Sequence, residues 1–270
     1  MALYDVSKGL ILAKKYERRL LPNLEKEGVW VSEKLDGVRA CWNGVELRSR
    51  VDKPICAPKW FLDQLPKTIP LDGELYIGKE MFNEISGVVR KKVPIDEEWK
   101  QITFRVFDVP GDEAYEDRLK KLSQVSRKGG VYQEVSKVRV YSEDALMDIY
   151  KNMVKDGAEG IMVRIPGSRY STKRTSDLLK LKPFFDFEVI VYDHEVGKGK
   201  YKGKLGALLV HLIDNPEITF KVGTGLCDND RETYKTSIPI GCKVTVSYQS
   251  INEKTGVPRF PAFVGVRSVD

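Results

Sequence analysis

The sequence predicts an α+β protein in which a domain of helices and strands is followed by a small domain made of strands. Segments rich in β-branched and aromatic residues recur along the whole chain, whereas helical patterns nearly disappear after residue 183. The 270 residues also exceed the length of a typical single domain. We therefore expect a boundary near residues 184–186, with domains at 1–184 and 185–270.

The expected secondary structure of the first domain includes one hairpin and two helices. Residues 38–42 and 45–47 are strand-like and flank Asn43-Gly44, a pair typical of two-residue turns. One helix is expected over residues 112–124. A second helix is expected to begin after Ser142 and to end near Gly157. Its apolar face would consist of Leu146, Ile149, Tyr150 and Met153.

The second domain is predicted from closely spaced strands with almost no helical pattern between them. Five short strands in fewer than ninety residues are typical of a small β-barrel, for which the oligonucleotide-binding (OB) fold is the natural candidate. The expected strands are 187–192, 207–213, 218–222, 243–248 and 263–268.

Composition excludes several classes of protein. No apolar run approaches the roughly 20 residues that span a bilayer, so we expect no membrane partner. Residues 9–13 are too short for a secretory signal and precede Lys14-Lys15, which favours the cytoplasm. The periplasm stays open as an alternative if a signal peptide has been removed. The four cysteines and two histidines lack the spacing of a metal site.

The charge of the chain favours a polyanionic partner. The formal net charge is +6, and the densest basic cluster lies within residues 197–204. Glycines in this segment let the backbone approach a partner closely, and lysines are suited to follow phosphates. A flexible, solvated loop is the alternative interpretation. The lysines of this cluster are Lys198, Lys200, Lys202 and Lys204.

The run Lys34-Leu35-Asp36-Gly37-Val38-Arg39 is the strongest candidate for a catalytic site. A lysine amine is mostly protonated at neutral pH, so a nucleophilic lysine needs burial or neighbouring cations. Arg39 supplies one cation, and a divalent metal that arrives with a nucleoside triphosphate would add more positive potential. Because Asp-Gly between strand-forming residues is also an ordinary hairpin signal, the other motifs must decide.

Two further motifs carry a glutamate to a strand. Asp72-Gly73-Glu74 and Glu159-Gly160 each join a turn to a strand-like segment. Carboxylates from two such places are suited to hold Mg²⁺ against phosphate oxygens, whereas either one alone is typical of a surface acid.

Aromatic and basic side chains complete the set of candidates. Phe104 and Phe107 alternate to opposite faces of one strand, and an aromatic ring near a nucleotide can stack on its base. Most such rings simply belong to a core. Lys180 and Lys182 share one face of a strand-like segment, so they must face water or phosphate.

The order of these motifs resembles that of the covalent nucleotidyltransferases, which comprise DNA ligases, RNA ligases and mRNA capping enzymes. The resemblance extends over nearly the whole chain. Segments 31–40, 177–183, 203–208 and 258–261 are most similar to minimal ATP-dependent DNA ligases of the small bacterial and Chlorella virus types. It implies a nucleotidyltransferase domain of the ATP-grasp-like ligase adenylation type, followed by an OB-fold domain.

The resemblance also implies a reaction, its cofactors and its partner. Lys34 would attack the α-phosphate of ATP to form a lysyl-AMP, with Mg²⁺ or Mn²⁺ present. The AMP would pass to the 5′-phosphate of a nick in duplex DNA, and the 3′-hydroxyl would displace it. We expect a monomer.

The implied roles of the remaining residues are these: Glu74 and Glu159 for metal and nucleotide; Arg39, Phe107, Lys180 and Lys182 for the nucleotide; Arg50 and Arg174 for the AMP and nick phosphates; and Lys198, Lys200, Lys202 and Lys204, with Arg50, for DNA.

Two positions depart from the family pattern. The residue two before the nucleophile is often acidic in larger ligases, but it is Ser32 here. The C-terminal motif is represented at best by Val266-Arg267, and Arg267 receives no role. A capping guanylyltransferase, an RNA ligase and a non-enzymatic nucleic-acid-binding module are the alternatives to the DNA ligase.

Overall fold

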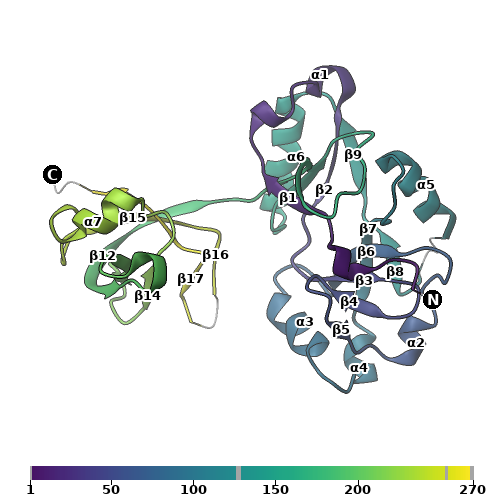
Figure 1. The fold of residues 1–270 in the computed structure, drawn as a ribbon, viewed down its shortest axis with the longest axis horizontal. Coiled ribbons are helices and arrows are strands. Elements are labelled where there is room, and N and C mark those ends of the chain that lie inside the picture. Colours follow the sequence, from purple (N-terminus) through teal and green to yellow (C-terminus); the bar gives the residue numbers. More distant parts are fainter. Residues whose placement is uncertain (1, 126–128, 253–254, 268–270) are drawn as a thin grey trace. The chain divides into compact units, whose positions relative to one another are not determined.

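The computed structural model describes residues 2–125, 129–252 and 255–267, which form two compact units (Figure 1). Contacts divide the chain into unit 1, Met1–Lys182, and unit 2, Pro183–Asp270. The predicted boundary after residue 184 lies two residues from this division. No helix of the described residues is long and apolar enough to cross a membrane.

Unit 1 contains two sheets. Sheet I has the strand order β1-β11-β10-β2-β9. It packs against helix α6 (Glu143–Lys155) over a core that includes Val31, Leu146, Ile161 and Val163. Its strands are β1 (Leu12–Lys15), β11 (Arg174–Leu181), β10 (Ile161–Arg164), β2 (Val29–Glu33) and β9 (Lys137–Val140).

Sheet II has the strand order β5-β4-β3-β6-β7-β8. Its core holds the largest buried rings of the chain, Trp42, Phe61, Trp99 and Phe104. Its strands are β5 (Pro54–Ile55), β4 (Leu47–Ser49), β3 (Val38–Trp42), β6 (Leu71–Tyr76), β7 (Thr103–Asp108) and β8 (Tyr132–Glu134). The helices of this part of the chain are α2 (Lys59–Leu62), α3 (Phe82–Val89), α4 (Asp96–Trp99) and α5 (Tyr115–Val125).

Both predicted helices of unit 1 are present, as α5 and α6. The side chain of Ser142 caps α6 by accepting a hydrogen bond from the backbone of Ala145. The predicted hairpin is also present, but its two-residue turn is wrong. Strand β4 begins only at Leu47, because the Asn43 side chain accepts hydrogen bonds from the backbone of Val45 and Glu46 and so widens the turn. The short elements η1 (Val6–Lys8), η2 (Arg18–Leu20) and α1 (Leu24–Glu27) complete this unit.

Unit 2 contains a five-stranded sheet with the order β14-β13-β12-β15-β18. All five predicted strands are present among the described residues, and residue 268, the end of the predicted strand 263–268, lies outside them. The ladder does not close into a barrel among the described residues, since its edge regions meet only through one bridge between Thr224 and Ala262. The elements are β12 (Phe185–Val196), η3 (Gly199–Tyr201), β13 (Leu205–Leu212), β14 (Thr219–Val222), α7 (Asp228–Ser237), β15 (Lys243–Tyr248), β16 (Ser250–Ile251), β17 (Pro258–Arg259) and β18 (Ala262–Val266).

Helix α7 was not predicted. Its sequence is strongly polar, so it lacks the apolar periodicity by which a helix is recognised. It is fixed instead by a capping box, in which the Cys227 sulfur and the Asp230 carboxylate each accept a backbone hydrogen bond. Its one buried residue, Arg231, binds backbone carbonyls of the sheet.

Candidate active site

A cavity of about 230 Å³ lies between the two sheets of unit 1. Sheet I lines it with alternate residues of three strands, because side chains two apart on a strand share one face. These are Trp30 and Ser32 on β2, Met162 and Arg164 on β10, and Leu178 and Lys180 on β11. Sheet II contributes Arg39 from β3, Glu74 from β6 and Phe107 from β7. The fold therefore brings distant parts of the sequence to one site.

The sequence-predicted nucleotide residues meet at this cavity. Seven of them line it: Lys34, Arg39, Arg50, Glu74, Phe107, Arg174 and Lys180. The other two, Glu159 and Lys182, are joined to it through ion pairs that start at Lys34. The four lysines of residues 198–204 belong to unit 2.

Lys34 lies directly after β2 and forms an ion pair with Glu159. The same carboxylate also binds Lys182, so one glutamate holds two ammonium groups. The backbone of Lys34 donates to the carbonyl of Gly160 at 2.9 Å. Gly160 has a φ of 140°, and a Cβ there would lie 2.1 Å from the Leu181 carbonyl oxygen. Only glycine therefore allows this close approach of strands next to the lysine.

Arg39 is held from three sides. Its Nε and Nη2 donate to the two carboxylate oxygens of Asp72, both at 2.6 Å, and Nη2 also reaches the Ile11 carbonyl. Its guanidinium lies 4.6 Å from the centre of the Phe107 ring. The Tyr170 hydroxyl donates to Asp72 at 2.6 Å. This arrangement fixes a cation and an aromatic face beside the cavity.

The electrostatics of the cavity shift two titratable groups. Desolvation raises the pKa of Glu74 to about 7, and the neighbouring carboxylates of Glu159 and Asp72 add to this rise, while Arg39 and Lys34 oppose it. Burial lowers the pKa of Lys180, and so do the positive charges of Lys182, Lys34 and Arg174. Cations and partly desolvated carboxylates are thus concentrated in one place, as is typical of functional sites.

The two remaining predicted arginines lie at more open positions of the cavity. Arg50 follows β4 and is exposed. Arg174, the first residue of β11, is also exposed and donates to the carbonyl of Ala13 on the neighbouring strand β1. Both guanidinium groups are accessible to an anionic partner.

The two phenylalanines of β7 have different roles, as alternation requires. Phe104 is fully buried in the core of sheet II. Phe107 lines the cavity and is only partly buried. Of the two rings, Phe107 is the one placed to contact a ligand.

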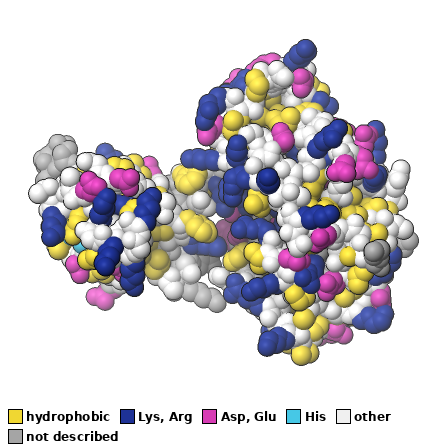
Figure 2. Space-filling model, in the orientation of Figure 1, with side chains coloured by type: hydrophobic (Ala, Val, Ile, Leu, Met, Phe, Trp, Pro, Cys, Tyr) yellow, Lys and Arg dark blue, Asp and Glu magenta, His cyan; other side chains and the backbone are white. Residues whose placement is uncertain are grey.

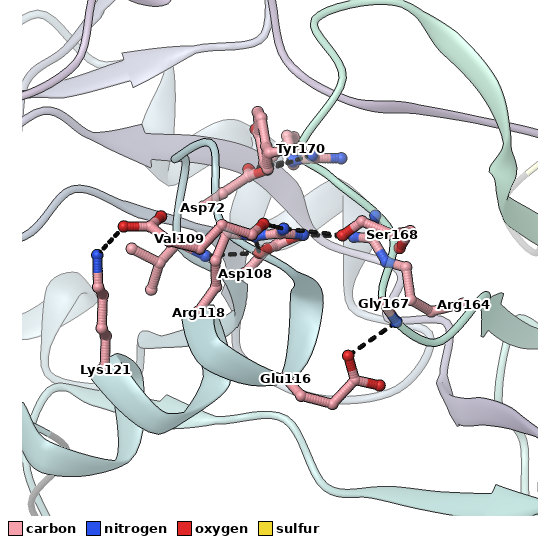
Figure 3. A network of polar contacts seen from close by, with 12 residues as sticks. Asp72, Asp108, Val109, Glu116, Arg118, Lys121, Arg164, Gly167, Ser168 and Tyr170 are labelled. Carbon is pink, nitrogen blue, oxygen red and sulfur yellow. Dashed lines mark hydrogen bonds and ion pairs between the residues drawn. The ribbon is translucent and has the colours of Figure 1, made fainter.

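A buried polar network that sequence reasoning missed supports one end of the cavity (Figure 3). Asp108, fully buried at the end of β7, accepts hydrogen bonds from Arg118 at 2.7 and 3.1 Å and from Arg164 at 2.7 Å. Arg118 also donates to the carbonyl of Ser168 at 2.9 Å. Glu116 accepts from the backbone of Gly167 and from the Trp30 indole. The sequence pattern singled out only Phe104 and Phe107 on this strand and gave no role to Asp108.

The lysine-rich segment of unit 2, residues 197–204, forms a tight loop around η3. Arg231 anchors it: its guanidinium lies 4.1 Å from the centre of the Tyr201 ring and donates to the carbonyls of Leu205, Gly206 and Gly223. Lys198, Lys200 and Lys202 are exposed. Among the described residues, Lys204 is the only one of the four lysines with an ion pair, which it makes with Glu232. Lys and Arg side chains are numerous on the visible faces of both units (Figure 2).

The donor set of the cavity suits a hard divalent cation in part. Glu74 and Glu159 supply carboxylate oxygens, and the negative charge of Glu159 is one cause of the raised pKa of Glu74. No group of three or more acidic, His or Cys residues suited to a metal occurs in the described part of the chain. Mg²⁺ commonly binds through one or two carboxylates together with substrate phosphates and waters, so two glutamates fit this cation.

Comparisons with known families agree with the two units. The family model for the ATP dependent DNA ligase domain matches residues 11–182. The model for the DNA ligase OB-like domain matches residues 196–267. Together they cover most of the chain.

Individual relatives are also DNA ligases. The DNA ligase of Haemophilus influenzae is 34% identical over 240 residues, which span 88% of this chain and 86% of the relative. A DNA ligase of African swine fever virus is 29% identical over 88% of this chain, which corresponds to 63% of the viral protein. These matches do not favour the capping enzyme, RNA ligase or non-enzymatic alternatives.

Solved structures show the same architecture. A Lig E DNA ligase shares 34% sequence identity with a TM-score of 0.86, covering 96% of this chain and 99% of that one. The adenylate of Chlorella virus DNA ligase has a TM-score of 0.52 at 22% identity, which supports the fold alone, and covers 97% of this chain and 99% of that chain. The chain therefore belongs to the ATP-dependent DNA ligases, with a nucleotidyltransferase domain followed by an OB-like domain.

Proposed function

We propose that Lys34 is the nucleophile of this ligase and that the cavity between the sheets of unit 1 binds ATP. The observation that carries the proposal is the position of Lys34, which opens on the cavity and is paired with Glu159 beside Lys182. Glu159 holds the Lys34 side chain at the cavity, and the neutral amine of a lysine in such a position is a nucleophile for phosphorus.

The proposed reaction has three transfers of the same phosphoryl type. In the first, the Lys34 nitrogen forms a bond to the α-phosphorus of ATP and pyrophosphate leaves. In the second, a 5′-phosphate oxygen of nicked DNA takes the AMP and frees the lysine. In the third, the 3′-hydroxyl attacks the activated 5′-phosphate, AMP leaves and the strand is sealed.

The other residues of the cavity bind and orient the nucleotide. Phe107 stacks on the adenine, and Arg39, Lys180 and Lys182 bind the nucleotide and its phosphates. Arg50 and Arg174, which are exposed, contact the AMP and the phosphates of the nick. Such positive groups neutralise the charge that develops on phosphoryl oxygens during transfer.

Glu74 and Glu159 would hold Mg²⁺ or Mn²⁺ in this proposal. A bound divalent ion would supply positive potential at the phosphates. Glu159 contributes without the ion too, because it orients the ammonium groups of Lys34 and Lys182.

Unit 2 is proposed to bind duplex DNA at a nick through its lysine-rich loop. Three exposed lysines there are free of ion pairs with the described residues, so they are available to phosphates. Arg231 keeps the loop in place, while the lysines of the loop stay solvated.

We also propose that the protein acts as a monomer in the cytoplasm. All residues assigned to the cavity come from one chain, and the four cysteines are free thiols, which is typical of a reducing compartment. Light scattering of the purified protein and fractionation of source cells test the two statements. A stable dimer, or recovery outside the cytoplasm, would contradict them.

The experiment for the proposed chemistry is a labelling and chase assay. The protein is incubated with α-labelled ATP or GTP and Mg²⁺, resolved under denaturing conditions, and then given nicked duplex DNA. A label from ATP that disappears as sealed strand accumulates is the expected result. A label from GTP alone would overturn the assignment to DNA sealing, and no label with either nucleotide would overturn the covalent mechanism.

A further inference from the structure

Arg164 carries two buried hydrogen-bond donors that meet no acceptor in the described part of the chain. The side chain is 5% exposed, and its Nη2 donates to Asp108 at 2.7 Å. Its Nε and Nη1 are buried without a partner. An arginine has only donors and keeps its charge at any ordinary pH. Because buried donors are almost always satisfied in folded proteins, these two nitrogens point to a ligand.

The register of the strands places Arg164 on the cavity side of sheet I. Met162 and Arg164 line the cavity, while Ile161 and Val163, which alternate with them, are buried in the core. The same alternation holds on the neighbouring strand β2, where Trp30 and Ser32 line the cavity and Val31 is buried in the core.

The register also sets the position of Arg164 along the cavity. On β2, Ser32 pairs with Met162 and Trp30 pairs with Arg164, and Lys34 follows the end of that strand. Moving away from the lysine therefore leads first to Met162 and then to Arg164. A strand advances about 3.3 Å per residue, so Arg164 lies far along the strands from Lys34. The phosphates of ATP are proposed to bind at the Lys34 end of the cavity.

The surroundings of Arg164 suit the aromatic base of a nucleotide rather than a phosphate. Its guanidinium lies 4.7 Å from the centre of the Tyr115 ring. Phe107, proposed to stack on adenine, directly precedes Asp108, the residue that holds Arg164. The same short segment of β7 thus positions both the ring that would cover the face of the base and the arginine that would meet its edge.

We propose that Arg164 is a base-contacting residue of the adenylation reaction, which donates from Nε or Nη1 to a ring nitrogen of adenine. Adenine offers three such acceptors, N1, N3 and N7. Asp108 and Tyr115 hold the guanidinium, so its free donors are in place before the nucleotide binds. The inference rests on the proposed binding of ATP in this cavity.

The test compares ATP with 1-deaza-, 3-deaza- and 7-deaza-ATP, each of which lacks one ring nitrogen. KM and kcat for formation of the labelled protein are measured for the wild type and for Arg164→Lys, which keeps the charge beside Asp108. We expect the variant to raise KM for ATP about 10- to 100-fold, the usual effect of losing a hydrogen bond to a charged donor. In the wild type, one of the three analogues should show the same rise.

The decisive observation is the combination of variant and analogue. In Arg164→Lys, the critical analogue and ATP should have equal KM values, because the lost contact cannot be lost twice. If the substitution instead raises KM by the same factor for ATP and for all three analogues, Arg164 acts only through packing and the proposal is wrong.

Arg118→Lys is the matched control. Arg118 binds the same Asp108 carboxylate but does not line the cavity. Arg118→Lys should change KM by the same factor for ATP and for all three analogues. The wild-type preference for ATP over the critical analogue should therefore be retained. A loss of that preference in Arg118→Lys would show that Asp108, rather than a direct contact from Arg164, decides it.

The wild type alone keeps the proposal testable if Arg164→Lys does not fold, which thermal melting would reveal. Equal use of ATP and all three analogues by the wild type would mean that no ring nitrogen receives a hydrogen bond. Absence of any labelling by the wild type is a different outcome, since it contradicts the proposed covalent chemistry itself.

Discussion

Three cations at the cavity and three cations of the lysine-rich loop are held in opposite ways. Lys34, Arg39 and Lys182 each have a carboxylate partner, and their side chains are only 14 to 20% exposed. Lys198, Lys200 and Lys202 are exposed and have no ion pair with the described residues. Fixed, partly buried charges favour one ligand in one geometry, whereas solvated charges attract any polyanion and are screened by salt. In the proposed function, this difference separates the site of chemistry from the surface that would bind DNA.

Loss of the nucleophile should give the largest effect. Lys34→Arg retains a cation for Glu159 but replaces the amine by a guanidinium that is not nucleophilic at neutral pH. We expect complete loss of labelling by ATP and of nick sealing, with an unchanged thermal melting temperature. Labelling that persists in this variant would remove Lys34 from its role.

Loss of the shared carboxylate should give the next largest effect. Glu159→Gln releases both Lys34 and Lys182 from their common partner. We expect the rate of adenylation to fall by a factor on the order of 10² to 10³, as for other preorganised electrostatic groups. Glu33→Gln is the control, because Glu33 lines the same cavity and has no ion pair with the described residues. Equal effects of the two variants in a rapid-quench assay would contradict the special position of Glu159.

Neutralising the loop should change DNA binding but not adenylation. In the variant with Lys198, Lys200 and Lys202 all changed to Ala, the slope of log K against log salt concentration should decrease in magnitude by about 3, since each phosphate contact contributes about 0.9. Titrations of labelled nicked DNA at several salt concentrations provide the slope. Lys221→Ala, which breaks an ion pair with Glu195 in the same unit, is the control and should leave the slope nearly unchanged.

The raised pKa of Glu74 should also make the free energy of unfolding depend on pH. The pKa of Glu74 is raised from 4.5 to about 7, so the folded state keeps this proton at pH values where the unfolded chain has lost it. The contribution of Glu74 to stability therefore decreases as pH rises from about 4.5 to 7. Glu74→Gln removes this penalty, on the order of 2 kcal/mol after allowance for partial solvent screening.

Urea denaturation at two pH values measures this effect. Glu74→Gln should be more stable than the wild type at pH 8 and close to it at pH 4.5. The same substitution in an exposed glutamate such as Glu97 should show no gain at pH 8. A stability difference that does not grow with pH would contradict the raised pKa of Glu74.

The smallest expected effect concerns the support of Arg39. Tyr170→Phe removes the hydroxyl that donates to Asp72 and leaves the pairing of Asp72 with Arg39 in place. A hydrogen bond of this kind is worth about 1 kcal/mol, so KM for ATP should rise about fivefold. Unchanged KM and unchanged stability together would mean that Tyr170 does not help to position Arg39.

Motif order and alternation singled out many of the residues that line the cavity, because these signals depend on short stretches of sequence. The glutamates next to glycines, the opposite faces of Phe104 and Phe107 and the strands of unit 2 all belong to this class. Each is set by neighbours within a few residues. The pattern of β-branched and aromatic residues is preserved in the folded strands for the same reason.

The parts that escaped prediction depend on contacts between distant segments. Asp108 binds Arg118, ten residues away, and Arg164, 56 residues away, and no local pattern encodes those pairs. Helix α7 escaped because a polar helix that inserts an arginine, Arg231, into the sheet has no apolar stripe. Its capping box at Cys227 and Asp230 was the one local signal, and a sulfur in that role is unusual.

The most direct test of the account is to identify the adenylated residue. Three lysines lie together at the site, Lys34, Lys180 and Lys182, so labelling alone does not distinguish them. The wild type is incubated with ATP and Mg²⁺, digested and analysed by tandem mass spectrometry. The account predicts AMP on Lys34 alone. AMP on Lys180 or Lys182, with Lys34 unmodified, would contradict the central claim that the lysine paired with Glu159 at the end of β2 is the nucleophile.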